Sequence, residues 1–250
     1  MCLIIFKPAG IAWDYQAIVN GFNNNPDGAG VMFPLGGQVH IERGFWDLDT
    51  LVEYLDANDL TARDAVLHFR WATHGKINVT NCHPFPVRRR VSTKSSLKTK
   101  LGVAHNGIIP GAIQSEYSDT LQFVTSTLTD IKQHIDKAWF SEFVGQATGS
   151  KFALMRTDGP VILIGEFSED DGIFYSNASY RSWAPLAEDD FVDDDSLLMG
   201  FCWECGLPTD DELCDACEDI HGWNYYGLEE KDTPDFSPNW QPAGAITSIS

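Results

Sequence analysis

The chain has 250 residues, of which 43% are hydrophobic and 21% are charged; this composition fits one or two globular domains and excludes a disordered, collagen-like or coiled-coil chain. Asp and Glu number 36 against 17 Lys and Arg, and the formal net charge of -19 disfavours nucleic acid as a partner. The apolar runs, such as Cys2 to Phe6, are far shorter than the roughly 18 residues that span a membrane. Because no basic leader precedes them, we expect a soluble, cytoplasmic protein with no membrane partner.

Short apolar runs predict buried strands joined by polar turns. Gly36-Gly37 and the segment from Thr157 to Pro160 have the composition of hairpin turns. The expected strands are 1–6, 31–33, 65–71, 101–104, 152–156, 161–164 and 173–175.

Two helices are expected outside these strands. The first spans Thr50 to Leu60, and the second begins near Ser118 and carries the apolar stripe of an amphipathic helix. The stripe consists of Leu121, Val124, Leu128, Ile131 and Ile135. Roughly the first 185 residues are thus predicted to form one α+β domain, with strands meeting strands and helices outside.

Cys2 has the chemistry of a nucleophile once Met1 is removed, which its small side chain permits. The residue would then carry both a thiol and an α-amine, whose ordinary pKa is near ~8. That amine can accept the thiol proton and later return it to a leaving group, so no histidine base is required. The alternative is that Cys2 is a small apolar residue of a buried strand.

Three further segments carry polar residues in a recognisable order. They are His68-Phe69-Arg70-Trp71-Ala72-Thr73-His74-Gly75, Asn81-Cys82-His83-Pro84 and His105-Asn106-Gly107-Ile108-Ile109. With Cys2, the Asp27-Gly28 loop and Asp119, this order resembles the glutaminase domain of class II glutamine amidotransferases. The resemblance covers about half of the chain and implies the N-terminal-nucleophile hydrolase fold, a four-layer αββα sandwich.

The resemblance implies that Cys2 attacks the carboxamide of L-glutamine and that the glutaminase reaction needs no cofactor. Asn106 and Gly107 would form the oxyanion hole that stabilises the tetrahedral intermediate. The alternative for this Asn-Gly pair is a type I′ hairpin turn.

Four residues are expected to bind the substrate. The planar guanidinium of Arg70 could hold the α-carboxylate of glutamine in a bidentate pair. Thr73 and the backbone near His74 would complete carboxylate binding, with His74 as a positioning residue. Asp119 would accept the α-ammonium group, and its alternative role is that of a first-turn helix carboxylate.

The composition changes near Ala187, where we divide the chain. We expect residues 2–187 to form the domain that resembles the amidotransferases, 188–199 an acidic linker, 200–220 a four-cysteine knuckle and 221–250 a C-terminal tail. Within the first domain, six of the 17 basic residues lie between Arg88 and Lys100, in a predicted mobile, polar insertion. This insertion either offsets the acidic charge of the protein or docks an acidic partner or phosphate.

The cysteines of the knuckle follow the pattern Cys-x2-Cys-x8-Cys-x2-Cys. Four thiolates at this spacing can surround one Zn²⁺, and a site closed by four thiolates has no open position for catalysis. We therefore predict a structural zinc ribbon, with two disulfides as the alternative. The predicted ligands are Cys202, Cys205, Cys214 and Cys217.

The sequence thus favours a glutaminase that works through a Cys2 thioester and passes ammonia to an acceptor enzyme on another chain. An acceptor on another chain is expected because too few residues follow Ala187 for an acceptor domain. Two alternatives stay open: a stand-alone γ-glutamyl amide hydrolase, and a catalytically silent zinc-containing interaction module.

Overall fold

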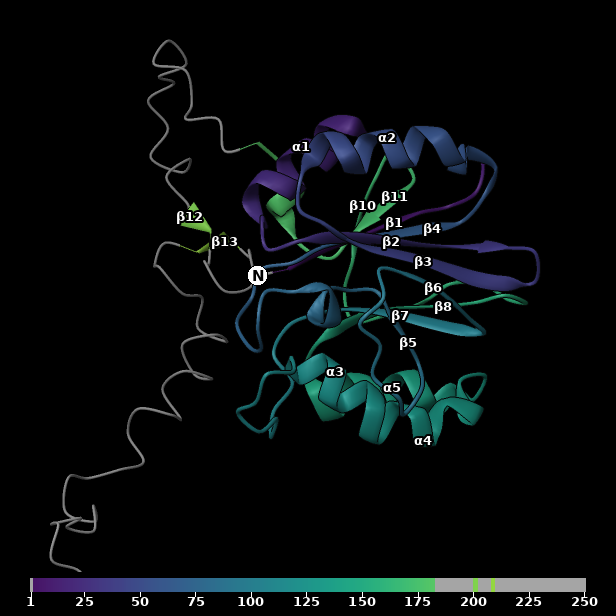
Figure 1. Ribbon diagram of the computed structural model, residues 1–250, viewed down its shortest axis with the longest axis vertical. Coiled ribbons are helices and arrows are strands. Elements are labelled where there is room, and N and C mark those ends of the chain that lie inside the picture. Colours follow the sequence, from purple (N-terminus) through teal and green to yellow (C-terminus); the bar gives the residue numbers. More distant parts are fainter. Residues whose placement is uncertain (1, 183–199, 202–207, 210–250) are drawn as a thin grey trace, which may run out of the picture.

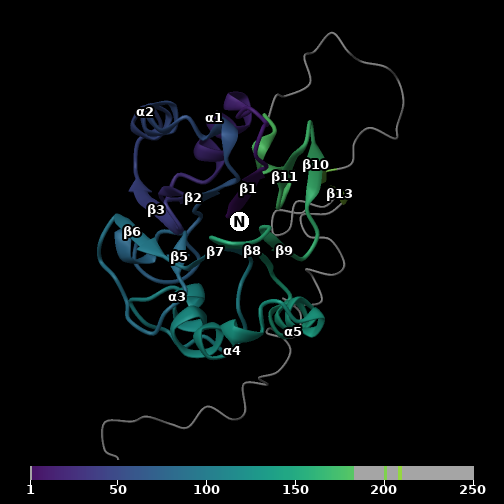
Figure 2. The ribbon, with the colours of Figure 1, turned by 90° about the vertical axis from the view of Figure 1, so that its right-hand side faces the viewer.

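The structure is a computed structural model that describes residues 2–182, 200–201 and 208–209. Two sheets lie face to face, and helices cover the outer face of each, so the domain has four layers (Figure 1). Figure 2 shows the same layers after a quarter turn. This mixture of helices and sheets confirms the predicted α+β class.

The larger sheet has seven strands in the order β10-β11-β1-β4-β2-β3-β6, and every pairing is antiparallel. The strands are β1 (Leu3–Lys7), β2 (Ala29–Leu35), β3 (Gln38–Phe45), β4 (Ala65–Phe69), β6 (Ser96–Thr99), β10 (Ser168–Asp170) and β11 (Ile173–Tyr175). Because β1 lies between β11 and β4, Cys2 precedes a strand in the interior of the sheet.

The smaller sheet has four antiparallel strands in the order β5-β7-β8-β9. They are β5 (Phe85–Pro86), β7 (Leu101–Asn106), β8 (Lys151–Arg156) and β9 (Ile162–Ile164). Both predicted hairpins are confirmed: β8 pairs with β9, and β2 pairs with β3 across Gly36-Gly37. These two glycines have φ values of 59° and 72°, the positive range that a type I′ turn requires.

Two groups of helices form the outer layers. α1 (Tyr15–Asn24) and α2 (Leu48–Asn58) pack on the larger sheet, while α3 (Asp119–Phe123), α4 (Thr129–Ile131) and α5 (Ala138–Thr148) pack on the smaller one. The remaining helical turns are the 3-10 turns Leu60–Ala62, Val79–Asn81, Lys132–His134 and Ala178–Tyr180 and the π-helical turn Val124–Leu128.

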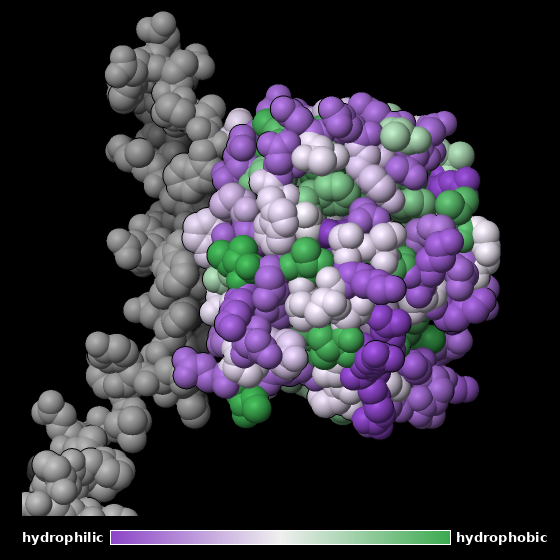
Figure 3. Space-filling model, viewed as in Figure 1, coloured by the Kyte–Doolittle hydropathy of each residue, from purple (hydrophilic) through white to green (hydrophobic). Residues whose placement is uncertain are grey.

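Successive side chains of β1 enter two different hydrophobic cores, one on each face of the larger sheet. Leu3 and Ile5 point into the core beneath α1 and α2, and Ile4 points into the core between the two sheets. Burying each such side chain contributes roughly 1.5 to 3 kcal/mol. On the face shown in Figure 3, hydrophobic side chains form small separate patches among polar ones, as expected when most apolar residues lie between the layers.

The helix predicted from Ser118 is interrupted. Its apolar stripe is buried at Leu121, Val124, Leu128 and Ile135, yet a π-helical turn separates α3 from α4. The hydroxyl of Thr125 donates to the Leu121 carbonyl at 2.8 Å, and that of Thr129 donates to the Val124 carbonyl at 2.6 Å. Such side-chain bonds compete with the regular helical ladder.

Among the described elements, the sequence prediction missed the helices α1 and α5 and the short strands β5, β6 and β10. In α1, a Cβ atom at Gly21 would lie 2.8 Å from a Leu3 methyl group, so glycine allows the helix to lie close to the sheet. β6 lies inside the predicted mobile insertion, which is a correction to that prediction. Leu97 is only 8% exposed and pairs with Ile41 of β3, so part of the basic stretch is an edge strand.

Beyond residue 182 the structure describes one short ladder, in which β12 (Gly200–Phe201) pairs antiparallel with β13 (Pro208–Thr209). The domain boundary at residue 187, the predicted linker and tail, and the four predicted zinc ligands lie outside the described residues. Within the described part, the helices are too short or too polar to cross a membrane.

Candidate active site

Cys2 lies where β1 enters the larger sheet, and its thiol contacts the backbone of the neighbouring segment. Its Sγ lies 3.4 Å from both the N–H and the carbonyl oxygen of Trp71, and Asn177 donates to the Cys2 carbonyl at 2.9 Å. Burial raises the pKa of this thiol, although the Trp71 backbone bond and the positive charge of Arg70 oppose the effect. The thiol is therefore protonated at neutral pH, and a thiolate would form only with the help of a base.

Arg70 follows β4, the strand that pairs with β1 beside Cys2. Its guanidinium is buried and donates to the carbonyls of His74 at 2.9 Å and Lys76 at 3.0 Å, which closes the loop between them. A guanidinium has five N–H donors, so three of those on Arg70 bond to no described residue. Burial lowers the pKa of Arg70, and the negative charges of a Cys2 thiolate and of Asp119 would raise it. Arg70 thus keeps donors available within electrostatic range of the thiol.

Asp27 fixes the backbone that surrounds the thiol. Its carboxylate accepts the N–H of Ala72 at 2.8 Å, and its own N–H donates to the Arg70 carbonyl at 2.9 Å. The adjacent Gly28 has φ +109°, and a Cβ atom there would lie 2.4 Å from the Trp46 ring. A side chain at Gly28 would therefore displace the loop that holds Trp71 against Cys2.

Asn106 ends β7 and is linked to β1 through one serine. Its Nδ2 donates to Ser176 Oγ at 3.0 Å, and the same Oγ accepts the N–H of Ile4 at 2.8 Å. The side-chain oxygen of Asn106 is buried and has no hydrogen-bond partner among the described residues. Ser176 thus connects the predicted oxyanion donor with the first strand.

The backbone conformation at position 107 requires glycine. Its φ is +137°, and a Cβ atom would lie 2.4 Å from Ser150 Oγ. It directly follows β7, so the Asn-Gly pair is not the turn of a hairpin between adjacent strands; β7 pairs with β5 and with β8.

Asp119 is buried at the start of α3, with Ser118 as the helix N-cap. One carboxylate oxygen accepts the Ile109 N–H at 2.8 Å, and the other accepts the Thr120 N–H at 2.7 Å. The first bond ties the loop after Gly107 to the helix. Both sequence interpretations of Asp119 are compatible with this position, because the carboxylate is in the first turn and also within electrostatic range of Cys2.

Thr73 and His74 lie in the loop that Arg70 closes, and His74 Nδ1 lies 3.3 Å from the Thr73 hydroxyl. This loop and the segment 113–117 line a pocket of about 390 Å³. Asn81 joins its two walls: its Nδ2 donates to the carbonyls of Lys76 at 2.9 Å and Glu116 at 2.7 Å. Thr73 and His74 therefore line this pocket, whereas Arg70 contacts the same loop through the carbonyls of His74 and Lys76 and is not among the lining residues.

Three buried histidines lie behind these residues. The rings of His68 and His83 stack with centroids 4.1 Å apart, and His68 Nε2 contacts the His105 carbonyl at 3.0 Å. Burial lowers the pKa of His68 to about 3 and that of His105 to about 4, and it lowers the pKa of His83 well below its ordinary value. All three are neutral at pH 7, and within the described chain none is hydrogen bonded to the Cys2 thiol.

Sequence reasoning did not assign roles to Asn81, Ser176 or Asn177. Ser176 and Asn177 bond to residues 172 and 175 positions away along the chain, so no local motif marks them. Asn81 lies in the segment Asn81-Cys82-His83-Pro84, but its bond to the Glu116 carbonyl, 35 positions away, is not visible in that segment. In the part of the chain that the structure describes, no group of three His, Cys, Asp or Glu side chains could hold a metal ion. The zinc prediction is not tested by this observation, because its cysteines lie elsewhere.

Comparison with known proteins gives the following similarities. The chain is 28% identical over 153 residues to glutamine–fructose-6-phosphate aminotransferase (isomerizing) of Pyrococcus horikoshii, a match that covers 60% of this chain and 24% of that enzyme. It is 30% identical over 165 residues to the enzyme of the same name from Bradyrhizobium diazoefficiens, covering 64% of this chain and 25% of that one. The chain thus spans about a quarter of the length of these curated relatives.

No family model matches the chain. Among solved structures, the glutamine phosphoribosylpyrophosphate amidotransferase of B. subtilis aligns with 70% of this chain and 41% of its own, at a TM-score of 0.41 and 16% identity. A score this low does not establish a shared fold. The sequence similarity is thus to enzymes that are named for their use of glutamine.

Proposed function

We propose that this chain is a class II glutamine amidotransferase that hydrolyses L-glutamine to glutamate and ammonia through a thioester on Cys2. The main support is the arrangement around the thiol: a buried arginine with three uncommitted donors directly follows the strand that pairs with β1, within electrostatic range of both Cys2 and Asp119. A cation and an anion near one nucleophile match the two charged groups of a free α-amino acid.

The reaction begins after removal of Met1, when the α-amine of Cys2 takes the thiol proton. This base is needed because burial raises the pKa of the thiol and the buried histidines are neutral and not bonded to it. The sulfur then attacks the carboxamide carbon of glutamine, and the carbonyl electrons move onto its oxygen. The amine returns the proton to nitrogen, ammonia leaves, and water hydrolyses the thioester to glutamate and the free thiol.

The remaining residues are assigned to binding and to charge stabilisation. Arg70, with Thr73 and the His74 backbone, holds the α-carboxylate, and Asp119 accepts the α-ammonium. Asn106 and the N–H of Gly107 face the developing oxyanion. Rotating the Asn106 amide by half a turn would let Ser176 donate to the side-chain oxygen that now has no partner. The amide nitrogen would then be available as a donor.

The ammonia is proposed to pass to an acceptor enzyme on another chain. The alternative is a γ-glutamyl amide hydrolase that acts alone, and relative rates separate the two. A glutaminase prefers glutamine itself, whereas the hydrolase works faster on a substituted γ-glutamyl amide.

Labelling with an electrophilic diazoketone analogue of glutamine tests the proposal. We expect one adduct, on a peptide that begins at Cys2, and protection of that peptide by added glutamine. Cys82→Ala is the matched control, because this second described thiol is fully buried and its burial raises its pKa to about 11, so its loss should leave labelling unchanged. Absence of an adduct on protein that lacks Met1 would reject the glutaminase and favour the hydrolase or a silent module.

We also propose that Cys202, Cys205, Cys214 and Cys217 bind one structural Zn²⁺, on the strength of their spacing alone. Metal analysis of protein purified under reducing conditions should give one zinc per chain, and the four thiols should resist alkylation until a chelator is added. Four readily alkylated thiols without zinc would exclude the site.

A further inference from the structure

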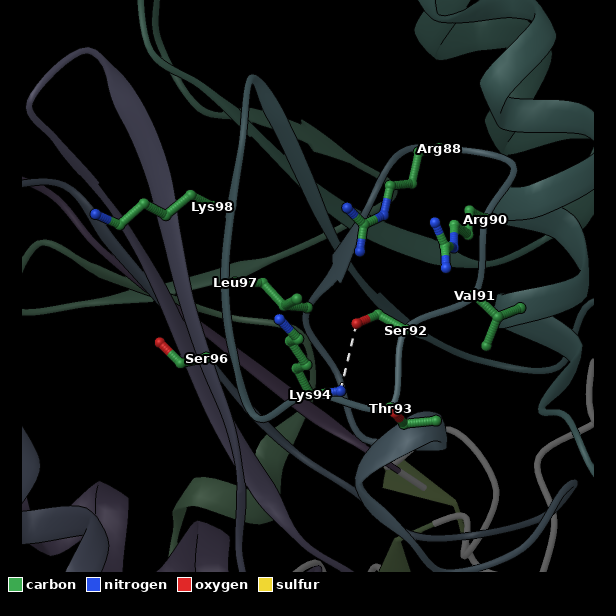
Figure 4. A pocket seen from close by; sticks show the side chains of 9 residues that line it. All are labelled: Arg88, Arg90, Val91, Ser92, Thr93, Lys94, Ser96, Leu97 and Lys98. Carbon is green, nitrogen blue, oxygen red and sulfur yellow. Dashed lines mark hydrogen bonds between the residues drawn. The ribbon is translucent and has the colours of Figure 1, made fainter.

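A second pocket, of about 600 Å³, lies in the basic stretch 88–98 and shares no residue with the candidate active site. Figure 4 shows its lining, which includes four cations and three hydroxyl groups and no acidic side chain. The lining residues are Arg88, Arg90, Val91, Ser92, Thr93, Lys94, Ser96, Leu97 and Lys98. Four of the 17 basic residues of a chain with a net charge of -19 are thus gathered around one hollow.

The cations of this pocket are not neutralised by the described residues. Arg89, between the two lining arginines, forms an ion pair with Asp130, whereas Arg88, Arg90 and Lys94 form none. The Nε of Arg88 is buried and without a hydrogen-bond partner in the same part of the chain. In Figure 4 the guanidinium groups of Arg88 and Arg90 point to the same side of their segment. Uncompensated charge of this density favours an anionic ligand.

A fifth cation, the buried Arg43, fixes the backbone of the pocket. Arg43 of β3 donates to the carbonyls of Ser92 at 2.7 Å and Lys94 at 3.3 Å, and on its other side to that of Cys82 at 3.0 Å. It makes no ion pair with any described carboxylate. The loop is therefore fixed before a ligand arrives, which reduces the entropy cost of binding.

We propose that this pocket binds the phosphoryl group of a small, non-aromatic phosphate ester. A phosphoryl group presents nearly two charges on three oxygens, enough acceptors for two arginine forks and neighbouring hydroxyls. A carboxylate has one charge and two oxygens and would leave most of these donors unused. No aromatic ring lines the pocket to stack on a base, and its volume exceeds that of phosphate alone, within the range of about 300 to 1,000 Å³ typical for small-molecule sites.

Calorimetry with inorganic phosphate, glucose phosphate and glucose tests the proposal, in the absence of glutamine and at about 0.15 M salt. We expect saturable binding of glucose phosphate, weaker binding of inorganic phosphate and none of glucose. Arg90→Gln should weaken glucose phosphate binding about tenfold or more, because a charge-assisted bond is lost. Arg88→Gln should do the same. Arg89→Gln removes the same charge outside the lining and should change the affinity by less than about twofold.

Three results would overturn the proposal. Binding that does not saturate, or that Arg89→Gln weakens as much as Arg90→Gln, would indicate general charge attraction. A hexaglutamate peptide that displaces glucose phosphate and binds more tightly would identify a surface for acidic polypeptides. Because Arg90 is exposed, its variant keeps the test valid even where Arg88→Gln fails to fold. None of these outcomes depends on glutamine hydrolysis.

Discussion

Two buried arginines, Arg43 within β3 and Arg70 directly after β4, have similar burial and different surroundings. Each is 2% exposed, each donates to loop carbonyls, and neither forms an ion pair with a described carboxylate. The guanidinium of Arg43 donates four hydrogen bonds, to the carbonyls of Thr80, Cys82, Ser92 and Lys94. That of Arg70 donates two, which leaves three of its five N–H donors without a partner among the described residues. A guanidinium whose donors are nearly all used holds structure together. One with spare donors beside a thiol is able to bind a substrate.

Arg70→Lys should have the largest effect, and on activity rather than on stability. Loss of two charge-assisted bonds, at about 1.5 to 3 kcal/mol each, is expected to lower kcat/KM for glutamine about 10² to 10⁴-fold. Steady-state glutaminase assays measure this change, with Arg43→Lys as the matched substitution at the other arginine. If Arg70→Lys kept its kcat/KM and instead melted at a much lower temperature, the two arginines would have the same structural role.

Arg43→Met should show the reverse pattern. Four carbonyls lose their donor at about 1 kcal/mol each, so the free energy of unfolding is expected to fall by about 3 to 4 kcal/mol. Urea unfolding followed by circular dichroism measures the loss. The kcat/KM per folded molecule should stay within about threefold of the parent, and a drop as large as that of Arg70→Lys would place Arg43 in the active site.

Like Arg43, the buried histidines have a structural role. They make the free energy of unfolding depend on pH. Burial lowers the pKa of His68 to about 3 and of His105 to about 4 in the folded domain, while an unfolded chain binds these protons near pH ~6.5. Stability is therefore complete above about pH 6.5 and falls as the pH drops below it, by about 1.4 kcal/mol per pH unit for each histidine. His83→Phe preserves a stacked ring and should reduce this slope by the contribution of one histidine, about 1.4 kcal/mol per pH unit. Urea unfolding at several pH values between neutral and mildly acidic measures the slope. An unchanged slope would show that His83 is protonated in the folded state.

Thr73→Val should have the smallest effect. Thr73 is exposed, so stability is expected to change by less than about 0.5 kcal/mol. Loss of one hydrogen bond to the substrate carboxylate should raise the KM for glutamine about tenfold and leave kcat nearly unchanged. Thr73→Ser is the control and should retain the parent KM. A fall in kcat without a change in KM would mean that Thr73 acts on the reacting amide.

The sequence analysis located the residues that end buried strands, and the reason is physical. Arg70 directly follows the buried strand β4, and Asn106 is the last residue of the buried strand β7. Each is therefore a polar residue that interrupts a recognisable apolar stretch. By contrast, Ser176 and Asn177 bond to residues 172 and 175 positions away, and a single polar residue in a loop carries no local sign of such a contact.

The missed elements have local compositions that conceal them. α1 contains Gly21 and ends in Asn23 and Asn24, which individually favour turns, and its close packing on Leu3 and Phe69 explains the glycine. β6 is a short edge strand within a basic stretch, where Leu97 is the single buried side chain. For the helix that begins near Ser118, the predicted buried face is confirmed, but the prediction of one continuous helix is wrong. The hydroxyls of Thr125 and Thr129 bond to backbone carbonyls where the helix is interrupted.

The bond from Asn177 to the Cys2 carbonyl has a consequence for biosynthesis. It joins residues 175 positions apart, and β11, which leads to it, pairs with β1 along the opposite edge from β4. At about 5 to 20 residues per second, a ribosome needs on the order of ten seconds or more to proceed from the first strand to its last partner. Until β11 is made, at least one edge of β1 is unpaired and the candidate site is incomplete. The arrangement around Cys2 is therefore assembled only when translation of the domain is nearly finished.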